Sequence, residues 1–516
     1  MGFIGILIQA LVLSVCCAAG GRRLLHYFQL ESYQLPGYVR SVKRNASRAL
    51  LPPVAMAAVG VSALKLGAPA VVRLALVAAM AAVLYAQSRR EKAKKGFVIT
   101  ERVKRLIAMH LTTAFVLEAI FLALSLPLGY LLPAFEAALI ALAALCAQPM
   151  EKRINRQFVD DAKKRLEAMP NLIRIGITGS YGKTSTKFLL RDILSVRYSV
   201  LATPSSFNTT MGVTRVIREQ LTGNHQVFIA EMGARHVGDI RELVDLVHPT
   251  MGLLTSVGPQ HLDTFGTIER VRDTKYELIE GLPQDGTAVF ARDGAICEEL
   301  YARCPLEKKY MPGDLMEASD IACGPWGTRF TLTDKETGEC ASCQTRLLGE
   351  HSIANLLLCC TAARLLGMTL QEIARGVARC QPVEHRLQLL DGGAGITIID
   401  DAFNANPVGA RAALRVLENF PGRRIIITPG MVELGGEEAE FNRAFGEQMA
   451  GSVDVAILVG RRHTQPIVDG LTHAGFPQEN IHVVGSLDES TQVLHAMMKA
   501  GDVVLYENDL PDNYSE

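Results

Sequence analysis

The sequence predicts an α-helical membrane region followed by two α/β domains. Long apolar runs fall almost entirely in the first 150 of the 516 residues. From residue 171 onward, short apolar strands alternate with helical patterns, which favours parallel α/β sheets. We therefore expect the membrane region at 1–150, a charged connector at 151–170, a central α/β domain at 171–385 and a C-terminal α/β domain at 386–516.

Five apolar runs in the membrane region are long enough to cross a bilayer, which takes about 20 residues. They are 3–19, 50–66, 69–87, 110–130 and 131–148. Basic residues cluster after the first and third runs, whereas the turns near Gly67 and Pro133 are short and nearly uncharged. The positive-inside rule then places the N-terminus outside and everything after Glu151 in the cytoplasm. The expected location is the cytoplasmic membrane, multi-pass, with membrane lipid as a partner.

Two other interpretations of these runs stay open. Residues 3–19 could be a cleaved signal peptide, and the alanine-rich runs could be buried helices of a soluble protein. A signal peptide carries its basic residues before the apolar core, whereas here they follow it. The segment 151–169 is charged and amphipathic, so we expect it to run along the membrane surface as a connector.

Composition argues against two classes of function. The chain has 53 basic and 53 acidic residues, and this balance gives no reason to expect a nucleic-acid partner. Its 11 cysteines include one close pair, Cys340 and Cys343. A tetrahedral zinc site usually shows two such pairs. Free thiols are therefore favoured over a zinc site.

The segment IRIGITGSYGKTSTK predicts a strand, a glycine loop and a helix start. In that order, the loop amides of residues 179–182 and the helix N-terminus face the phosphates of a nucleoside triphosphate. Lys183 adds a fixed charge, and Thr184 offers its hydroxyl to Mg²⁺. The common GxxxxGK[ST] pattern is not met, because Ile177 stands where its first glycine belongs. The shorter GxxGKTST form still predicts an ATP site.

Functional side chains of parallel sheets lie beyond the carboxyl ends of the strands. Further strands are predicted at 227–230, 251–255 and 287–290, and in the C-terminal domain at 397–399, 424–428, 453–459, 481–484 and 503–505. Glu231 directly follows one strand, where it could bind Mg²⁺ opposite Thr184 or serve as a helix N-terminal acid. His261 and Asp263 follow the next strand. The imidazole could ligate a metal, contact a phosphate, or lie on the surface.

Nine ordered motifs run, with gaps, from Thr178 to Glu447. They are TGSYGKTSTK, SSFNTTMGVTRVI, AEMGARHVGDIREL, SVGPQHLDTFGT, RDTKYELI, GEHSIANLLLCCTAA, EHRLQLL, IIDDAFNANP and GMVELGGEEAEFNRAFGE. In this order they resemble the Mur ligase family, the ATP-dependent amide-forming enzymes of peptidoglycan synthesis. The closest type adds D-alanyl-D-alanine to the UDP-N-acetylmuramoyl tripeptide. The resemblance implies a central P-loop ATPase domain and a Rossmann-like C-terminal domain.

The resemblance also implies roles for individual residues. Lys183, Lys275, His261 and Arg386 would be catalytic. The nucleotide would be held by Gly179, Ser180, Gly182, Lys183, Thr184, Ser185, Asn355 at the adenine, Arg386 at the γ-phosphate, and Asp401 at the ribose or the domain linker. Thr184, Glu231, His261 and a carbamylated Lys275 would hold two Mg²⁺ ions, unless Lys275 is a solvated helix lysine. Asn208 and Thr209 would face the acceptor, and Asn404 and Asn406 would shape the interdomain cleft or form turns.

The implied reaction is ATP-dependent amide formation through an acyl phosphate. A muramyl-peptide precursor would be the acceptor, and D-alanyl-D-alanine or a similar amino acid or dipeptide would be the amine. The sequence departs from the family in two places, because the UDP-sugar-binding domain is absent and GDVVLYENDLPDNYSE stands where an LVKGSR-like segment belongs. Two alternatives therefore stay open: a Mur-like ligase that makes a peptide or poly-amino acid outside peptidoglycan, and a nucleotide-gated membrane scaffold or transporter.

Overall fold

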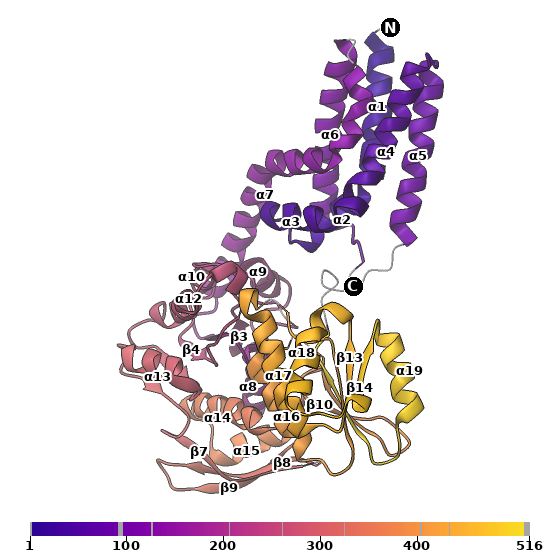
Figure 1. Ribbon diagram of the computed structural model, residues 1–516. Helices are drawn as coiled ribbons and strands as arrows, with labels where there is room; N and C mark the ends of the chain where they lie inside the picture. Colours follow the sequence, from indigo (N-terminus) through magenta and orange to yellow (C-terminus); the bar gives the residue numbers. More distant parts are fainter. Residues whose placement is uncertain are drawn as a thin grey trace. The chain divides into compact units, whose positions relative to one another are not determined.

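The computed structural model describes residues 3–90, 96–124, 127–205, 207–260, 262–324, 326–402, 405–432 and 434–509. Two predicted site residues, His261 and Asn404, lie outside the described residues. Contacts divide the chain into two compact units, Met1–Gln157 and Phe158–Glu516 (Figure 1). The first unit is helical, and the second contains every strand of the described part.

Helices α1, α4, α5 and α6 of the first unit lie side by side (Figure 1). The unit consists of α1 (Phe3–Gly20), α2 (Arg22–Leu30), α3 (Leu35–Arg44), α4 (Ala46–Lys65), α5 (Ala70–Arg90), α6 (Glu101–Ala123), the 3-10 helix η1 (Pro127–Phe135) and the first part of α7 (Glu136–Glu167). Leu13, Met56, Val77 and Tyr130 form part of its core. In the described part of the chain, five helical segments are long and apolar enough to cross a membrane: Phe3–Gly20, Ala46–Lys65, Ala70–Arg90, Glu101–Ala123 and Leu128–Glu167.

The last two segments differ from their predicted bounds. Helix α6 begins at Glu101, because the Thr100 side chain caps it by accepting a hydrogen bond from the Val103 amide. The turn predicted near Pro133 is wrong, since Pro133 lies inside η1. The predicted connector begins inside α7, which continues without interruption from apolar to charged sequence. Its course along a membrane surface stays a prediction. Hydropathy reports where apolar side chains gather, but it does not report where helical hydrogen bonding stops.

Polar side chains are buried among the apolar helices of this unit. His110 on α6 lies 2.9 Å from Glu136 on α7, and both side chains are fully buried. Two glycines make room for buried carboxylates: a Cβ on Gly21 would stand 2.0 Å from a Glu136 oxygen, and one on Gly129 would stand 2.6 Å from a Glu118 oxygen. The helices therefore pack around these acids at positions without side chains.

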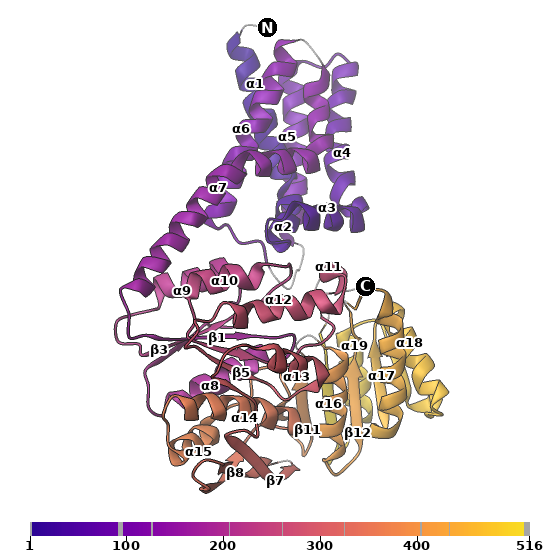
Figure 2. The ribbon, with the colours of Figure 1, turned by 90° about the vertical axis from the view of Figure 1, so that its left-hand side faces the viewer.

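The second unit begins with a parallel sheet in the order β2-β3-β1-β4-β5-β6. Its strands are β1 (Ile173–Thr178), β2 (Val200–Ala202), β3 (Val227–Glu231), β4 (Met251–Leu254), β5 (Thr287–Phe290) and β6 (Lys309–Tyr310). The helices are α8 (Lys183–Leu194), α9 (Thr210–Glu219), α10 (Asp239–Val247), α11 (Leu262–Phe265), α12 (Ile268–Glu280), α13 (Gly294–Arg303), α14 (Glu350–Leu365) and α15 (Leu370–Arg379). Figure 2 shows α9, α10 and α12 on one face of this sheet and α8 and α14 on the other. Both faces are therefore covered, as a parallel sheet requires.

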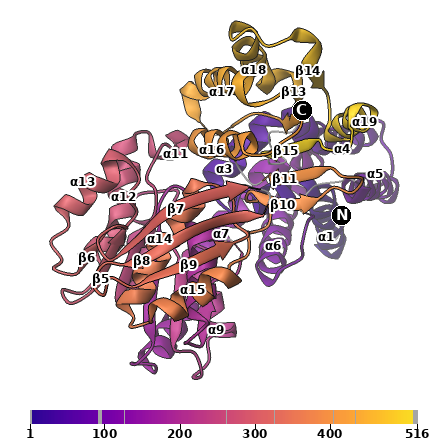
Figure 3. The ribbon, with the colours of Figure 1, turned by 90° about the horizontal axis from the view of Figure 1, so that it is seen from below.

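An antiparallel sheet that the sequence analysis missed follows β6. It consists of β7 (Met316–Gly324), β8 (Gly327–Asp334) and β9 (Cys340–Thr345), which lie side by side in Figure 3. Alternate residues of β8 and β9 are buried against the core of the central domain. Together the three strands contain one isoleucine and no valine, so they gave little hydropathy signal.

The C-terminal sheet has the order β10-β11-β15-β12-β13-β14, and only β10 is antiparallel to its neighbour. Its strands are β10 (Gln388–Asp391), β11 (Thr397–Asp401), β12 (Arg424–Thr428), β13 (Val455–Val459), β14 (Ile481–Val484) and β15 (Val503–Glu507). Its helices are α16 (Pro407–Glu418), η2 (Gly435–Glu437), α17 (Glu438–Ser452), α18 (Arg461–His473), η3 (Gln478–Asn480) and α19 (Leu487–Met497). Every strand predicted from the sequence is present, with ends shifted by at most two residues.

Candidate nucleotide and metal site

The glycine loop between β1 and α8 is held by the segment that follows β4. Gly179 has φ +149°, and a Cβ there would stand 2.0 Å from the Thr255 hydroxyl oxygen. The Ser180 amide donates to the Ser256 carbonyl at 2.7 Å, and the Ser180 hydroxyl donates to the Gly258 carbonyl at 2.9 Å. These contacts therefore fix the backbone conformation of the loop, and its first position requires glycine.

Gly182 starts helix α8 in the left-handed conformation, with φ +77°. The first intrahelical bond runs from the Thr186 amide to the Gly182 carbonyl, so the amides of Lys183, Thr184 and Ser185 point out of the helix end. Such an N-terminus attracts anions such as phosphate. Asn355 on α14 lies beside it, because a Cβ on Gly182 would stand 2.9 Å from the Asn355 amide oxygen. The adenine contact of Asn355 stays a prediction.

The Lys183 side chain folds back over the loop. Its ammonium donates to the carbonyls of Gly179 at 2.6 Å and Ser180 at 2.9 Å. Desolvation lowers the pKa of Lys183 to about 8, although the Glu231 carboxylate raises it, and the positive charge of Arg386 lowers it further. Lys183 therefore lies within electrostatic reach of Glu231 and Arg386.

Glu231 ends β3 and is 1% exposed. Its carboxylate accepts a hydrogen bond from the Thr184 hydroxyl, which is 3.1 Å from each oxygen. The Asn208 amide also donates to it at 3.1 Å. A buried Lys187, which the sequence analysis missed, lies 2.9 Å away. Lys187 follows Lys183 by four residues on α8, and this spacing on one helix face was the available signal.

Thr209, the second predicted acceptor residue, caps helix α9. Its hydroxyl accepts a hydrogen bond from the Gly212 amide at 3.3 Å. Asn406 likewise caps α16, accepting from the amides of Val408 at 3.2 Å and Gly409 at 2.9 Å. Both side chains therefore have a local structural role, and their contacts with substrate or cleft stay predictions.

Lys275 lies on α12 and is only 2% exposed. The alternative that it is a solvated helix lysine is therefore wrong. Desolvation, followed by the charge of Lys183, holds the pKa of Lys275 well below its usual value, while Asp239, Glu277 and Glu231 raise it. The structure thus brings Lys275, Lys183 and Glu231 into one electrostatic neighbourhood.

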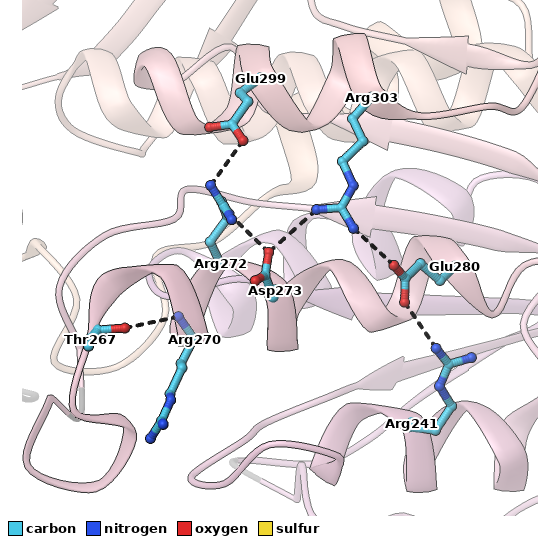
Figure 4. Close-up of polar contacts among 8 residues, drawn as sticks. All are labelled: Arg241, Thr267, Arg270, Arg272, Asp273, Glu280, Glu299 and Arg303. Atoms are coloured by element: carbon cyan, nitrogen blue, oxygen red, sulfur yellow. Dashed lines mark hydrogen bonds and ion pairs between the residues drawn. The ribbon is translucent and has the colours of Figure 1, made fainter.

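Hydrogen bonds and ion pairs hold helix α12 in place on both sides of Lys275. The Glu277 carboxylate accepts hydrogen bonds from the amides of Gly238 at 2.9 Å and Arg241 at 2.8 Å, at the start of α10. A chain of ion pairs then joins α10, α12 and α13 (Figure 4). It runs Arg241–Glu280 (3.0 Å), Glu280–Arg303 (3.3 Å), Arg303–Asp273 (3.4 Å), Asp273–Arg272 (3.0 Å) and Arg272–Glu299 (2.9 Å). At the start of α12, the Arg270 amide donates to the Thr267 hydroxyl at 3.4 Å (Figure 4).

Arg386 lies in the linker between the central and C-terminal domains. Its neighbours His385 and Leu387 both have positive φ, +59° and +45°, a backbone conformation that side chains rarely adopt. Burial lowers the pKa of Arg386, whereas Asp401 and Glu231 raise it. Asp401 accepts a hydrogen bond from the Leu387 amide at 3.1 Å, and burial raises its pKa to about 6 despite Arg386. Of the two roles predicted for Asp401, the linker contact is present.

The segment that departs from the family's LVKGSR pattern forms β15 and the residues after it. Glu507 ends this strand, is 1% exposed and stands opposite Asp401 in the sheet. Burial raises its pKa to about 8, the Asp401 charge raises it further, and a hydrogen bond of 3.0 Å from the Thr428 hydroxyl lowers it. A buried acid therefore stands at the carboxyl edge of the C-terminal sheet.

Comparison with known proteins decides the family. The family model for the Mur ligase middle domain matches residues 177–363, and the model for the Mur ligase glutamate ligase domain matches residues 385–506. The chain is 31% identical over 358 residues to UDP-N-acetylmuramoyl-tripeptide--D-alanyl-D-alanine ligase of Mycobacterium bovis, an alignment that covers 64% of this chain and 69% of the relative. The chain belongs to the Mur ligase family. The resemblance seen in its motifs is confirmed.

Three more comparisons support this conclusion. The Bacillus subtilis enzyme of the same name is 26% identical over 338 residues, 64% of this chain and 72% of the relative. The crystal structure of MurF from Acinetobacter baumannii matches with a TM-score of 0.62 at 23% identity, covering 70% of this chain and 78% of that chain. MurF from Thermotoga maritima in complex with ADP gives 0.61 at 24% identity, covering 69% and 80%. At these identities the two structures confirm the Mur ligase fold of the α/β part.

Proposed function

We propose that this Mur ligase joins the carboxylate of a muramyl-peptide precursor to the amine of D-alanyl-D-alanine or a similar amino acid or dipeptide. The observation that carries the proposal is the hydrogen bond from Thr184, at the start of α8, to the Glu231 carboxylate. Lys183, Lys275 and Arg386 lie within electrostatic reach of this carboxylate. The names of the relatives in Mycobacterium bovis and Bacillus subtilis support the choice of substrates.

The side chains present fit ATP and a divalent cation. The outward amides of residues 183–185 and the Lys183 ammonium suit phosphate oxygens. The Thr184 hydroxyl and the Glu231 carboxylate share a hydrogen bond, and both are the oxygen ligands that Mg²⁺ prefers. Among the described residues, which do not include His261, no three His, Cys, Asp or Glu side chains gather as a metal group. We expect two ions, as in the prediction from the sequence.

The reaction uses these residues for positioning and charge. ATP supplies the γ-phosphoryl group: the acceptor carboxylate oxygen bonds to the γ-phosphorus as ADP leaves, and the amine nitrogen then bonds to the acyl carbon as phosphate leaves and a proton is lost. Lys183 and Arg386 stabilise the negative charge that develops on the transferred group. Burial and the charge of Lys183 lower the pKa of Lys275, which favours its amine form and suits it to carbamylation, which would add an oxygen ligand beside Glu231.

We further propose that the first unit anchors the enzyme in the cytoplasmic membrane, with its α/β domains in the cytoplasm. Five candidate spans and the basic helices that follow α1 support this placement. The family models match from residue 177 onward and the helical first unit precedes that match, so we propose a lipid-linked acceptor beside a UDP-linked one.

An ATP-dependent ligation assay on the full chain in detergent tests the proposed function. Muramyl tripeptide is offered in UDP-linked and in lipid-linked form with D-alanyl-D-alanine, and mass spectrometry follows the product. We expect a product with either or both acceptors, and none from Lys183→Ala. ADP release that needs neither acceptor nor amine would contradict the proposal.

A second candidate is a ligase whose product lies outside peptidoglycan. The observation that favours it is Glu507, which stands buried where the family carries the LVKGSR-like segment. The same assay with amino acids and short peptides as alternative acceptors and amines separates the two. A product formed only from these alternatives would favour the second candidate.

A further inference from the structure

Lys187 connects three elements around the candidate metal site. It lies one helical turn after Lys183 on α8, and its side chain is fully buried. Its ammonium lies 2.9 Å from the Glu231 carboxylate on β3 and also donates to the Ser205 carbonyl, in the segment between β2 and α9. The Lys187 ammonium therefore links helix α8, the end of β3 and the segment between β2 and α9.

The contacts of the Glu231 carboxylate show which groups Lys187 holds in place. Lys187 binds one carboxylate oxygen, whereas the Asn208 amide donates to the other at 3.1 Å. The Thr184 hydroxyl is 3.1 Å from both. The carboxylate is thus held on one side by Lys187 and on the other by the segment that carries Asn208.

The segment after β2 is also clamped through its backbone. The Gly233 amide donates to the Asn208 carbonyl at 2.8 Å, and a Cβ on Gly233 would stand 2.7 Å from the Asn208 side chain. Ser205 has φ +44°, a backbone conformation that a non-glycine residue keeps only when contacts from neighbouring elements stabilise it. Lys187 supplies such a contact through the Ser205 carbonyl.

We propose that Lys187 is a positioning residue that holds the Glu231 carboxylate and the Asn208 segment in one arrangement, so that the cation site and the acceptor-binding segment form together. The inference rests on the proposed roles of Glu231 and Asn208. Removing Lys187 has two opposing effects on a bound cation. A repelling charge disappears, but the carboxylate loses the partner that orients it.

Orientation outweighs repulsion at this site. Lys187 holds a Glu231 oxygen at 2.9 Å and also donates to the Ser205 carbonyl, so its loss frees both the carboxylate and the loop. Losing an outer partner of a metal ligand typically weakens metal binding 10- to 100-fold. A Lys187 variant should therefore bind the cation more weakly and also hold the acceptor less well.

The test uses the full chain in detergent and the variant Lys187→Met. Mn²⁺ binding to the ADP-bound protein is followed by electron paramagnetic resonance, and the Michaelis constant for the acceptor by the ligation assay. We expect the dissociation constant for Mn²⁺ to rise about 10- to 100-fold and the acceptor constant to rise with it. ADP affinity measured without a divalent cation should stay unchanged, because the glycine loop is intact.

Arg191→Met is the matched control, since Arg191 is a cation on the same helix one turn further on and pairs with Asp192. It should change neither measurement. Lys187→Arg keeps the charge but alters the geometry, so we expect a smaller rise in both constants, and it decides the question if Lys187→Met does not fold. Unchanged constants in the Lys187 variants, or equal losses in Arg191→Met, would overturn the proposal.

Glu231→Gln separates this inference from the proposed function. If Glu231→Gln binds Mn²⁺ as the wild type does, the metal role of Glu231 is wrong. A rise in the acceptor constant of Lys187→Met would then still support the positioning of the Asn208 segment, and its absence would overturn it.

Discussion

Buried ionisable side chains determine, at the residue scale, how this protein responds to pH. Lys183 has a pKa of about 8, so most of it carries the charge that phosphate needs at pH 7 and little of it does at pH 9. ADP affinity without a divalent cation should therefore fall about tenfold between pH 7 and pH 9. Isothermal titration calorimetry measures it, and Lys183→Met should bind weakly and without this pH dependence. A wild-type affinity that is flat over this range would contradict the assignment.

Glu507 makes a second pH prediction. Its pKa in the folded state is about 8, above the usual 4.5, so the folded state binds a proton that the unfolded state releases. Stability is highest below pH 4.5 on this account and is lost as pH rises toward 8. Glu507→Gln removes the free-energy cost of ionising this buried carboxyl group, and at pH 8 it should stabilise the protein by up to about 4 kcal/mol.

Thermal unfolding of the full chain at pH 5 and pH 8 checks the Glu507 prediction. The gain from Glu507→Gln should be large at pH 8 and small at pH 5. Glu479→Gln, at an exposed position on η3, is the control and should change neither value. An equal effect of Glu507→Gln at both pH values would show that its protonation is not the cause.

At the scale of elements, the placement of α12 depends more on one buried acid than on the ion pairs of Figure 4. Glu277 accepts two backbone hydrogen bonds at the start of α10, and a bond to a charged acceptor contributes about 1.5–3 kcal/mol. Asp273 is half exposed, and an exposed ion pair such as Asp273–Arg303 contributes at most about 1 kcal/mol to stability. Glu277→Gln should thus lower stability and ligation rate together, because Lys275 lies two residues away.

Denaturant unfolding and the ligation assay compare Glu277→Gln with Asp273→Asn. We expect a loss of about 1–3 kcal/mol for the first and less than about 1 kcal/mol for the second, with the rate reduced only in the first. The reverse order would mean that the ion-pair chain, and not the α10 contact, holds α12.

The close packing around Gly21 in the first unit allows a separate prediction about its replacement by alanine. Alanine at Gly21 would force the Glu136 carboxylate aside and break its pair with His110. We expect Gly21→Ala to cost about 1–3 kcal/mol, because the added methyl group would overpack the buried Glu136 carboxylate. Gly5→Ala is the control, because nothing lies within 4 Å of its added Cβ and alanine favours a helix. Thermal unfolding in detergent should show a lower midpoint for Gly21→Ala alone.

The membrane anchor is a prediction about the whole molecule. The full chain should sediment with membranes, resist carbonate extraction and dissolve in detergent, because five apolar segments would have to leave the bilayer together. A C-terminal tag should be digested by protease in inside-out vesicles and protected in right-side-out ones. Release of the intact chain by carbonate would contradict the anchor, whereas a digested tag in right-side-out vesicles would reverse the orientation.

Local sequence determined the nine predicted strands and the glycine loop, for a physical reason. Runs such as Arg424–Thr428 contain β-branched residues that favour strands, and the loop before Lys183 needs glycine at Gly179 and Gly182 whatever surrounds it. These signals extend over a few residues, so one sequence shows them. The antiparallel strand β9, with small polar residues on its exposed face, gave no such signal.

Only the tertiary structure decided which charged groups meet. The sheet order β3-β1-β4 brings Glu231 to Thr184 and Lys187, which lie 47 and 44 residues away in the chain. The linker brings Arg386 within reach of the same carboxylate, and helix packing joins His110 to Glu136. Hydropathy and propensity are local properties of the chain, whereas an ion pair depends on strand order and helix packing. The sequence by itself therefore determined the ligase motifs and the apolar helices, and the fold decided that Lys187 and Glu231 meet in the candidate nucleotide and metal site.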